Sequence, residues 1–361
     1  MHQLFESHCY HATNWHKIHE IIQTKSWSAD ESDIEIRSYG KIRFPLLLIT
    51  GADGKLELKR GDNRLRIDGP GQPPDDINNE TRFLPDEEFK TWIDTTPDNP
   101  LNRKKQDTKN FFNGEQIRLK DYGIVNNSGD SILDLKLEWT NYYATFLTNL
   151  NTQMLLTFRN DGKKVCQIYQ APLDKIDKCR LSNPIAINLS VISSEKNSDK
   201  YIFIASRNRT DAWNVMDGIQ PAVSRGANKD DLNENGTYDP FVHAHRAIKE
   251  EVTGILVADL EVTLFGLART CKTRFPFLFG DVQVGLPKAA LEANNFTNGT
   301  PVGIPFTVDG VFNWLRSCYN DQKFAEKGII IGTTIFSILE SCRHRFSQND
   351  WIDLLKKLDE L

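Results

Sequence analysis

Alternating apolar and polar positions indicate strands in the middle of the chain. In the segment SILDLKLEWTNYYATFLTNL, apolar residues recur at every second position from Leu133 to Trp139, as in a strand with one buried face. PIAINLSVISS and KYIFIASRN are rich in β-branched and aromatic residues, and the polar turn EKNSD joins them. LEVTLFGLART and FPFLFGDVQVGL have the same character. We therefore predict a strand in each of these five segments.

The two ends of the chain show different patterns. KIRFPLLLIT and GADGKLELKRGDNRLRI are β-type runs with Gly and Asp turn signals, which favour a hairpin or meander. Residues 62–113 are turn-rich and mark either a domain boundary or a long exposed insertion. From VDGVFNWLRSCYN to Leu361, apolar residues recur at helical spacing. The sequence therefore predicts a strand-rich start and two or three helices at the end.

The segment DPFVHAHRAIKEEVTGI has the signals of a capped helix. It follows GIQPAVSRGANKDDLNENGTY, which we interpret as a Gly-containing loop. Asp239 is a natural N-cap, and Pro240 suits the first helical position because its missing N–H would have no partner there. Gly254 is a natural end. One stripe of the helix is apolar and is expected to face a sheet; it comprises Phe241, Ala244, Ile248, Val252 and Ile255.

Two adjacent glutamates stand near the end of this helix. Glu250 and Glu251 follow Arg246 by about one turn, so that Arg246 is placed to orient Glu250. Mg²⁺ is commonly held by one or two carboxylates together with substrate phosphates and waters. Such an ion neutralises charge on a phosphate and lowers the pKa of a bound water. Because Lys-Glu-Glu is also common on solvent-exposed helix faces, the residues alone leave both interpretations open.

Length, charge and cysteine content restrict the class of protein. The chain has 361 residues, enough for one large domain or two. Its net charge of −5 argues against a general nucleic-acid-binding surface, but it allows a small anionic ligand. The six cysteines are scattered, as is typical of reduced thiols, and no apolar stretch approaches the roughly 20 residues of a membrane span. We therefore expect a cytoplasmic protein without a membrane segment.

The order of strands, Gly-containing loop, capped helix and strand resembles the Nudix hydrolase superfamily, whose signature is G-x5-E-x7-R-E-U-x-E-E-x-G-U, with U aliphatic. RAIKEEVTG places Arg246, Ile248, Glu250 and Glu251 on the R, U, E and E of this signature. The resemblance covers about residues 184–286. It implies an α+β fold, a Nudix-like α/β/α sandwich with a mixed sheet, within a domain of residues 116–361. A strand-rich N-terminal region of residues 1–115 and a helical C-terminal tail are expected in addition.

The sequence departs from this signature at three points. Ala247 stands where the family has the first glutamate of R-E, normally a metal ligand. Thr253 stands at the glycine, and the G-x5-E element after Gly226 is out of register. Another side chain could supply the missing ligand, and the sequence leaves five candidates open: Asp230, Asp231, Glu234, Asp239 and His243.

The resemblance implies hydrolysis of a diphosphate bond in a nucleotide. A nucleoside triphosphate, cleaved to monophosphate and pyrophosphate, is the first expected substrate, followed by ADP-ribose or another dinucleotide. Glu250 and Glu251 would bind Mg²⁺ or Mn²⁺. Glu251 would also accept the proton of the attacking water, and Arg246 would hold the two glutamates in place. Arg225 and Arg207, near the strand ends that should flank the cleft, are candidates for phosphate contact.

Other classes of function stay open. A Nudix-like module that binds a nucleotide without hydrolysing it, and signals through its N-terminal region, agrees with the alanine at position 247. A purely structural partner protein would neither turn over nucleotides nor be stabilised by them. Residues 1–115 match no family pattern and are candidates for gating the substrate or for forming a homo-oligomer.

Overall fold

The computed structural model describes residues 10–11, 37–39, 42–44, 46–49, 56–73, 91, 114–127, 130–149, 176, 181–193, 199–207, 218–252, 260–270, 275–294, 296–297, 299–320, 329–330 and 332–360. For some of these, Arg207 among them, only the backbone is described. The expected helix-end residue Gly254 and most of the turn-rich stretch of residues 62–113 lie outside the described residues.

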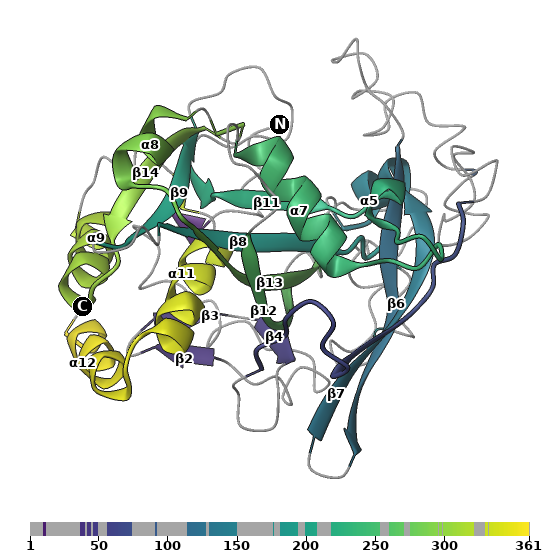
Figure 1. Ribbon diagram of the computed structural model, residues 1–361, viewed down its shortest axis with the longest axis horizontal. Helices are drawn as coiled ribbons and strands as arrows, with labels where there is room; N and C mark the ends of the chain where they lie inside the picture. The colour runs from purple at the N-terminus through teal and green to yellow at the C-terminus, as the bar shows by residue number, and fades with distance from the viewer. Residues whose placement is uncertain are drawn as a thin grey trace.

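A mixed sheet lies at the centre of the structure (Figure 1). Across it, in order, are β1 (Tyr10–His11), β15 (Ile329–Ile330), β10 (Gly218–Pro221), β9 (Tyr201–Arg207), β8 (Ala186–Ser193), β13 (Pro276–Val284), β12 (Glu261–Thr270) and β4 (Leu46–Ile49). In addition, β11 (Val223–Gly226) pairs with β8, and β14 (Thr300–Pro305) pairs with β9. β8 runs parallel to β13, and β10 to β15, whereas the other pairs are antiparallel.

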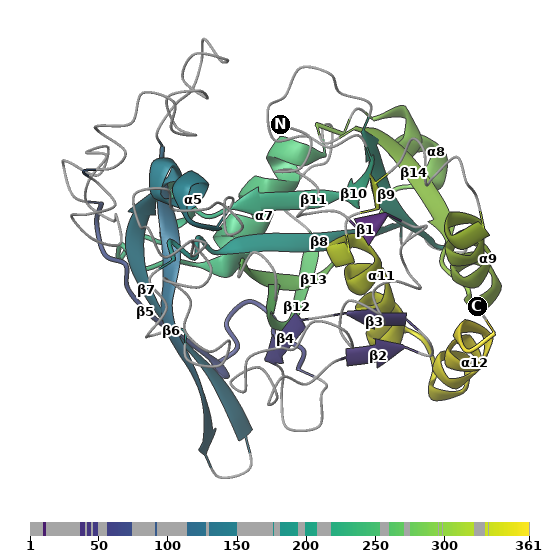
Figure 2. The ribbon, with the colours of Figure 1, turned by 180° about the vertical axis from the view of Figure 1, so that it is seen from behind.

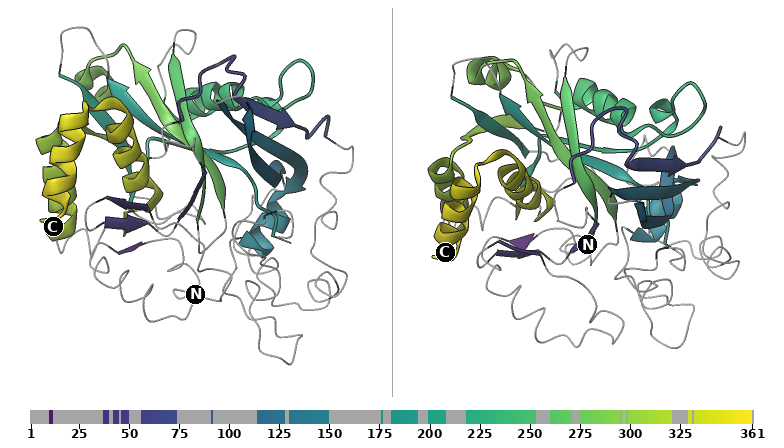
Figure 3. Two further views of the ribbon diagram at one scale, coloured as in Figure 1. Left: turned by 90° about the horizontal axis from the view of Figure 1, so that it is seen from below. Right: turned by 60° about the horizontal axis from the view of Figure 1, so that its bottom comes forward.

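Helices cover both faces of this sheet. On one face lies α7 (Pro240–Glu251), and on the other lies α11 (Gly332–Arg345), which is in front when the molecule is seen from behind (Figures 1 and 2). The sheet has a hydrophobic core on each face, and successive side chains of β13 point to opposite faces. Leu278 packs in the core on the α7 side, and Phe279 packs in the core on the α11 side. Figure 3 shows the sheet between these helical layers. The prediction of an α+β fold with a mixed sheet is confirmed.

Other helices complete the second layer. α9 (Val308–Asn320) and α12 (Gln348–Leu358) pack with α11 through buried residues that include Leu315, Phe336 and Leu354. Helical spacing in the C-terminal tail therefore predicted its structure correctly. The short helix α8 (Lys288–Ala293) lies before β14.

A smaller sheet stands beside the large one. It contains β5 (Leu65–Asp68), β7 (Asp130–Asn141) and β6 (Glu115–Asn127), followed by the short helix α5 (Tyr142–Leu147). The β6–β7 hairpin extends past the rest of the molecule (Figure 1). Leu133, Leu135 and Leu137 are buried, as their alternation predicts, and backbone hydrogen bonds of Ile117 with Ile185 and Ala227 join the two sheets.

Local sequence explains why α7 begins where it does. The Asp239 side chain accepts hydrogen bonds from the backbone N–H groups of Phe241 and Val242, and Pro240 follows it at the first helical position. Ile248 is fully buried against the sheet side of the helix, as expected from its stripe. The helix ends at Glu251, and the Val252 N–H caps it by donating to the carbonyl of residue 248.

The prediction of a loop before α7 is wrong for the first part of that segment. Gly218–Pro221 and Val223–Gly226 form β10 and β11, which hydrogen bond to β9 and β8 respectively. Gly and Pro interrupt the apolar alternation in this segment, so the local pattern does not indicate a strand. The backbone partners on β8 and β9, and the burial of Ala222 and Val223, override the weak local preference.

Parts of the N-terminal region belong to the same structure. β4 pairs with β12, and Leu58 forms a β-bridge with Leu264. Tyr39, of the two-stranded sheet β2 (Arg37–Tyr39) and β3 (Ile42–Phe44), is buried in the α11-side core. The division of the chain at residue 115 stays a prediction. None of the described helices combines the length and the apolar character that a bilayer-spanning segment needs.

Candidate active site

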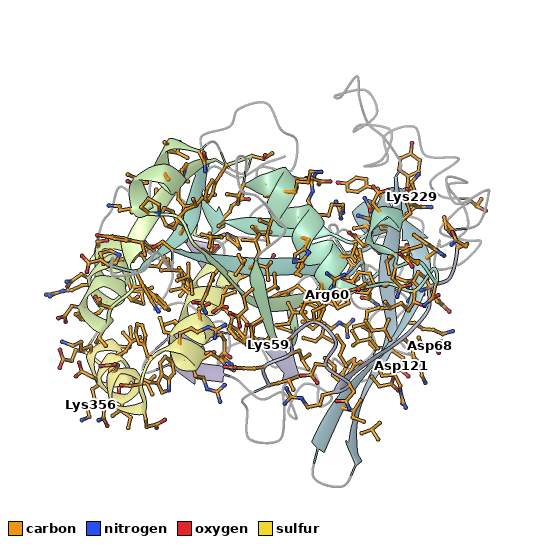
Figure 4. All side chains as sticks on the ribbon, in the orientation of Figure 1. Lys59, Arg60, Asp68, Asp121, Lys229 and Lys356 are labelled. Atoms are coloured by element: carbon orange, nitrogen blue, oxygen red, sulfur yellow. The ribbon has the colours of Figure 1, made fainter. Side chains whose placement is uncertain are left out.

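Three elements meet at the candidate active site: strand β11, the 3-10 turn η5 (Lys229–Asp231) and helix α7. A capping box shapes η5, because Asn228 accepts from the N–H of Asp230 and Asp231 accepts from the N–H of Asn228 at 2.8 Å. Lys229, labelled in Figure 4, forms an ion pair with Glu115 of β6 at 3.2 Å. The capping box therefore fixes the shape of the turn, and Lys229 links it to β6.

Acceptors surround the guanidinium of Arg246. Asp231, which is fully buried, accepts from Nε at 2.6 Å and from Nη2 at 2.8 Å. Nη2 also donates to the carbonyl of Gly226 at 2.9 Å, and Nη1 donates to Oε2 of Glu250 at 3.0 Å. Burial opposes the charged form of Arg246, but Asp231 and Glu250 outweigh it and raise the pKa of Arg246 above its ordinary value. The contact between Arg246 and Glu250 expected from their spacing is present.

A second guanidinium bridges the two glutamates. Nε of Arg225 donates to Oε2 of Glu250 at 2.7 Å, and its Nη2 contacts the same oxygen. Nη1 of Arg225 lies 3.2 Å from Oε1 of Glu251. The side chain of Glu251 is 1% exposed, whereas those of Glu250 and Arg225 are 34% and 41% exposed. The glutamates therefore form one buried and one half-exposed carboxylate.

Three carboxylates and two guanidinium groups of the described residues meet at this site. Among the contacts between described side chains, Asp231 binds Arg246, and Arg225 contacts both glutamates. Their place at the end of α7 adds to the repulsion, because a helix C-terminus carries partial negative charge. Burial raises the pKa of Glu250, but the two arginines outweigh it and hold this pKa below its usual range. Among the described side chains of the site, carboxylates therefore outnumber guanidinium groups by three to two.

This donor set fits a hard divalent cation such as Mg²⁺. Carboxylate oxygens are its preferred protein ligands, and one or two of them suffice when waters and phosphate oxygens complete the shell. Among the described residues, no group of three or more His, Cys, Asp or Glu side chains is placed to hold a metal. Glu250 and Glu251 would be the protein ligands, and the remaining ligands would come from water and substrate.

A buried histidine lies behind Asp231. His243 is fully buried, its Nδ1 is 2.8 Å from the hydroxyl of Tyr238, and its Nε2 is 3.9 Å from Oδ2 of Asp231. Burial lowers the pKa of His243 to about 4, and Asp231 opposes this only in part. His243 is therefore neutral at pH 7 and packs beside the acidic cluster without adding charge.

The five candidates for the missing metal ligand differ in their contacts and in their exposure. Asp231 binds Arg246, Asp239 caps α7, and His243 contacts Tyr238. Asp230 and Glu234 are exposed.

Two other expectations concern Ala247 and Arg207. Ala247 is fully buried in the apolar core on the α7 side, so a longer acidic side chain there would enter the core. The side chain of Arg207 lies outside the part of the chain that is described.

Sequence reasoning did not identify the partner of Arg246. Asp231 lies 15 residues before Arg246 and was only one of several acids in its loop. One sequence pattern could have singled out Asp231 among these acids. The segment Asn228-Lys-Asp-Asp231 has the spacing of a capping box.

No model of a known protein family matches the chain, and no curated protein matches it. Function must therefore be inferred from the site.

Loss of the Asp231 carboxylate should weaken the fold. We expect Asp231→Asn to lower the free energy of unfolding by about 2 kcal/mol, because a charge-assisted pair of hydrogen bonds to Arg246 is lost. Urea unfolding measures this change. Asp230→Asn, at the exposed neighbouring position, is the matched control and should change stability by less than about 0.5 kcal/mol. Equal effects of the two variants would contradict the assigned contact.

The depressed pKa of His243 should make folding depend on pH. The folded protein protonates His243 near pH 4, whereas the ordinary value is 6.5, so between these values the unfolded chain binds more protons. Stability is fully present above pH 6.5 and falls as the pH drops toward 4, by up to about 1.4 kcal/mol per pH unit. Urea unfolding at several pH values should show a shallower dependence in His243→Gln, and an unchanged dependence would contradict this origin.

Proposed function

We propose that the protein is a metal-dependent hydrolase of Nudix type that cleaves a diphosphate bond in a nucleotide. The observation that carries this proposal is the pair of adjacent carboxylates, buried Glu251 and part-exposed Glu250, at the negative end of a helix and bridged by Arg225. Burying one of two adjacent carboxylates is costly unless a cation compensates it. Groups of interacting, partly buried charges such as this one are common at functional sites.

Each residue has a distinct part in this proposal. Arg246 is fixed by Asp231 and Gly226, and through its bond to Glu250 it holds that carboxylate in place. Glu251 is buried and therefore poorly solvated, which suits it to accept the proton of the attacking water. A divalent cation bound by the glutamates would lower the pKa of water at the site and neutralise charge on the phosphate.

The proposed substrate is a nucleoside triphosphate, cleaved to the monophosphate and pyrophosphate. In this reaction a new bond forms between water oxygen and phosphorus, the bridging P–O bond breaks, and pyrophosphate leaves. ADP-ribose or another dinucleotide, which also contains a diphosphate bond, is the second candidate. Both classes present phosphate oxygens to complete the shell of the cation.

A nucleotide panel tests this function. The full chain is incubated with each nucleoside triphosphate, ADP-ribose and a dinucleotide, in Mg²⁺ or in Mn²⁺, and products are separated by chromatography. We expect turnover of at least one compound that stops when a chelator is added. Absence of metal-dependent products from every compound would refute hydrolysis.

One observation favours a second function, the binding of a nucleotide without turnover. Both glutamates are paired with arginines, and Ala247 is buried where the family signature has a metal ligand. A sensor of this kind would be stabilised by nucleotides in thermal unfolding but would release no product from the same panel. The two measurements together separate hydrolase from sensor.

A further inference from the structure

We infer that Arg225 is an internal counter-ion which a divalent cation must displace from Glu250 and Glu251. This inference rests on the proposed function, and it gives Arg225 a different part from that of a phosphate contact. It begins from geometry, since one guanidinium contacts both carboxylates and so stands where a shared cation would be bound.

Charge favours the exchange. With Arg246 already matched by Asp231, the two glutamates and Arg225 carry a formal charge of −1. A divalent cation in place of Arg225 would bring this to zero, and it would also offset the partial negative charge of the helix end. A divalent cation therefore matches the charge of the two carboxylates more fully than Arg225 does by itself.

The two arginines differ in how firmly they are held. Arg246 is 13% exposed and has acceptors on Asp231, Gly226 and Glu250. The Arg225 side chain is 41% exposed, and each of its described side-chain contacts is to one of the two glutamates. Arg225 can therefore move toward solvent without breaking other contacts seen in the described residues, whereas Arg246 stays in place.

Competition of this kind has a measurable consequence. When Arg225 is away from the glutamates in only a fraction of the molecules, the apparent affinity for a cation is the intrinsic affinity multiplied by that fraction. Removing the guanidinium should therefore tighten binding of the bare metal. If Arg225 instead held the glutamates in position for the metal, its removal would weaken metal binding, because the glutamate side chains would become less ordered.

Titration of the full chain with Mn²⁺ alone, followed by the electron paramagnetic resonance signal of free Mn²⁺, tests the inference. We expect Arg225→Gln to bind Mn²⁺ about tenfold more tightly than the natural chain, if about one molecule in ten is open. Arg225→Lys should fall between them, because a lysine keeps the charge but not the fork that spans two carboxylates. Lys249→Gln removes an exposed positive charge next to Glu250 and should change the affinity by less than about twofold.

The outcomes separate the inference from the proposed function. Mn²⁺ binding that is unchanged or weaker in Arg225→Gln would overturn the displacement and leave the metal site intact. Absence of binding in every protein would overturn both. Binding in Arg225→Gln but not in the natural chain would support displacement and indicate that Arg225 holds the site closed. If Arg225→Gln does not fold, Arg225→Lys decides, since tighter binding supports the inference and unchanged binding overturns it.

Discussion

Replacement of Glu251 by Gln is expected to lower hydrolysis of the nucleotide substrate by about 100-fold or more. Gln keeps the size of the side chain and its helix propensity, but it can neither accept a proton nor supply an anionic ligand. The measurement is kcat with saturating Mg²⁺ on the compound that the natural chain turns over fastest.

Stability provides the control for this variant. Glu251→Gln removes a charge from a buried position and relieves its repulsion with Glu250, so thermal unfolding should hardly change. Lys249→Gln changes an exposed charge on the same helix and should keep full activity. If Glu251→Gln keeps its activity on every hydrolysed nucleotide, the glutamates are an ordinary charged helix end and the proposed function is wrong.

Ile248→Asp should be the most destabilising of the substitutions considered. Ile248 is fully buried between α7 and the sheet, so the variant places a carboxylate in an apolar core and loses apolar packing. We expect the free energy of unfolding to fall by about 3 kcal/mol or more. Chemical denaturation followed by circular dichroism measures this loss.

The chain offers a matched control for that substitution. Ile352 lies on α12 and is 39% exposed, so Ile352→Asp makes the same chemical change on a helix without burying the charge. Its cost should stay within about 1 kcal/mol, close to the difference in helix propensity. Similar losses in the two variants would show that the burial assigned to Ile248 is wrong.

Periodicity predicted the regular parts of this fold well. The strand through Leu133 and Leu137 and the helix from Asp239 could be recognised, because each alternates or repeats over several residues and α7 has a strong N-cap. β10 and β11 could not, since Gly218 and Pro221 interrupt the pattern and the strands depend on partners elsewhere in the chain. Local sequence does not contain that information.

The candidate site was predictable only along the helix. Spacing placed Arg246 beside Glu250, because both lie on one helix face, and this contact is present. The partners Asp231 and Arg225 come from other elements, 15 residues before Arg246 and 25 residues before Glu250. Their contacts depend on how η5 and β11 are folded against α7, which helical periodicity does not describe.

β1 and β4 lie at the two ends of the large sheet, where an open strand edge could pair with another molecule. Both strands come from the first 50 residues, and between them they pair with β15 and with residues Leu267–Thr270 of β12. Without them, backbone N–H and C=O groups on both of these strands would be open to strands of another molecule, as on any uncovered sheet edge. Among the described strands, the two ends of the large sheet are thus formed by short strands of two and four residues, which offer little backbone for pairing with another sheet.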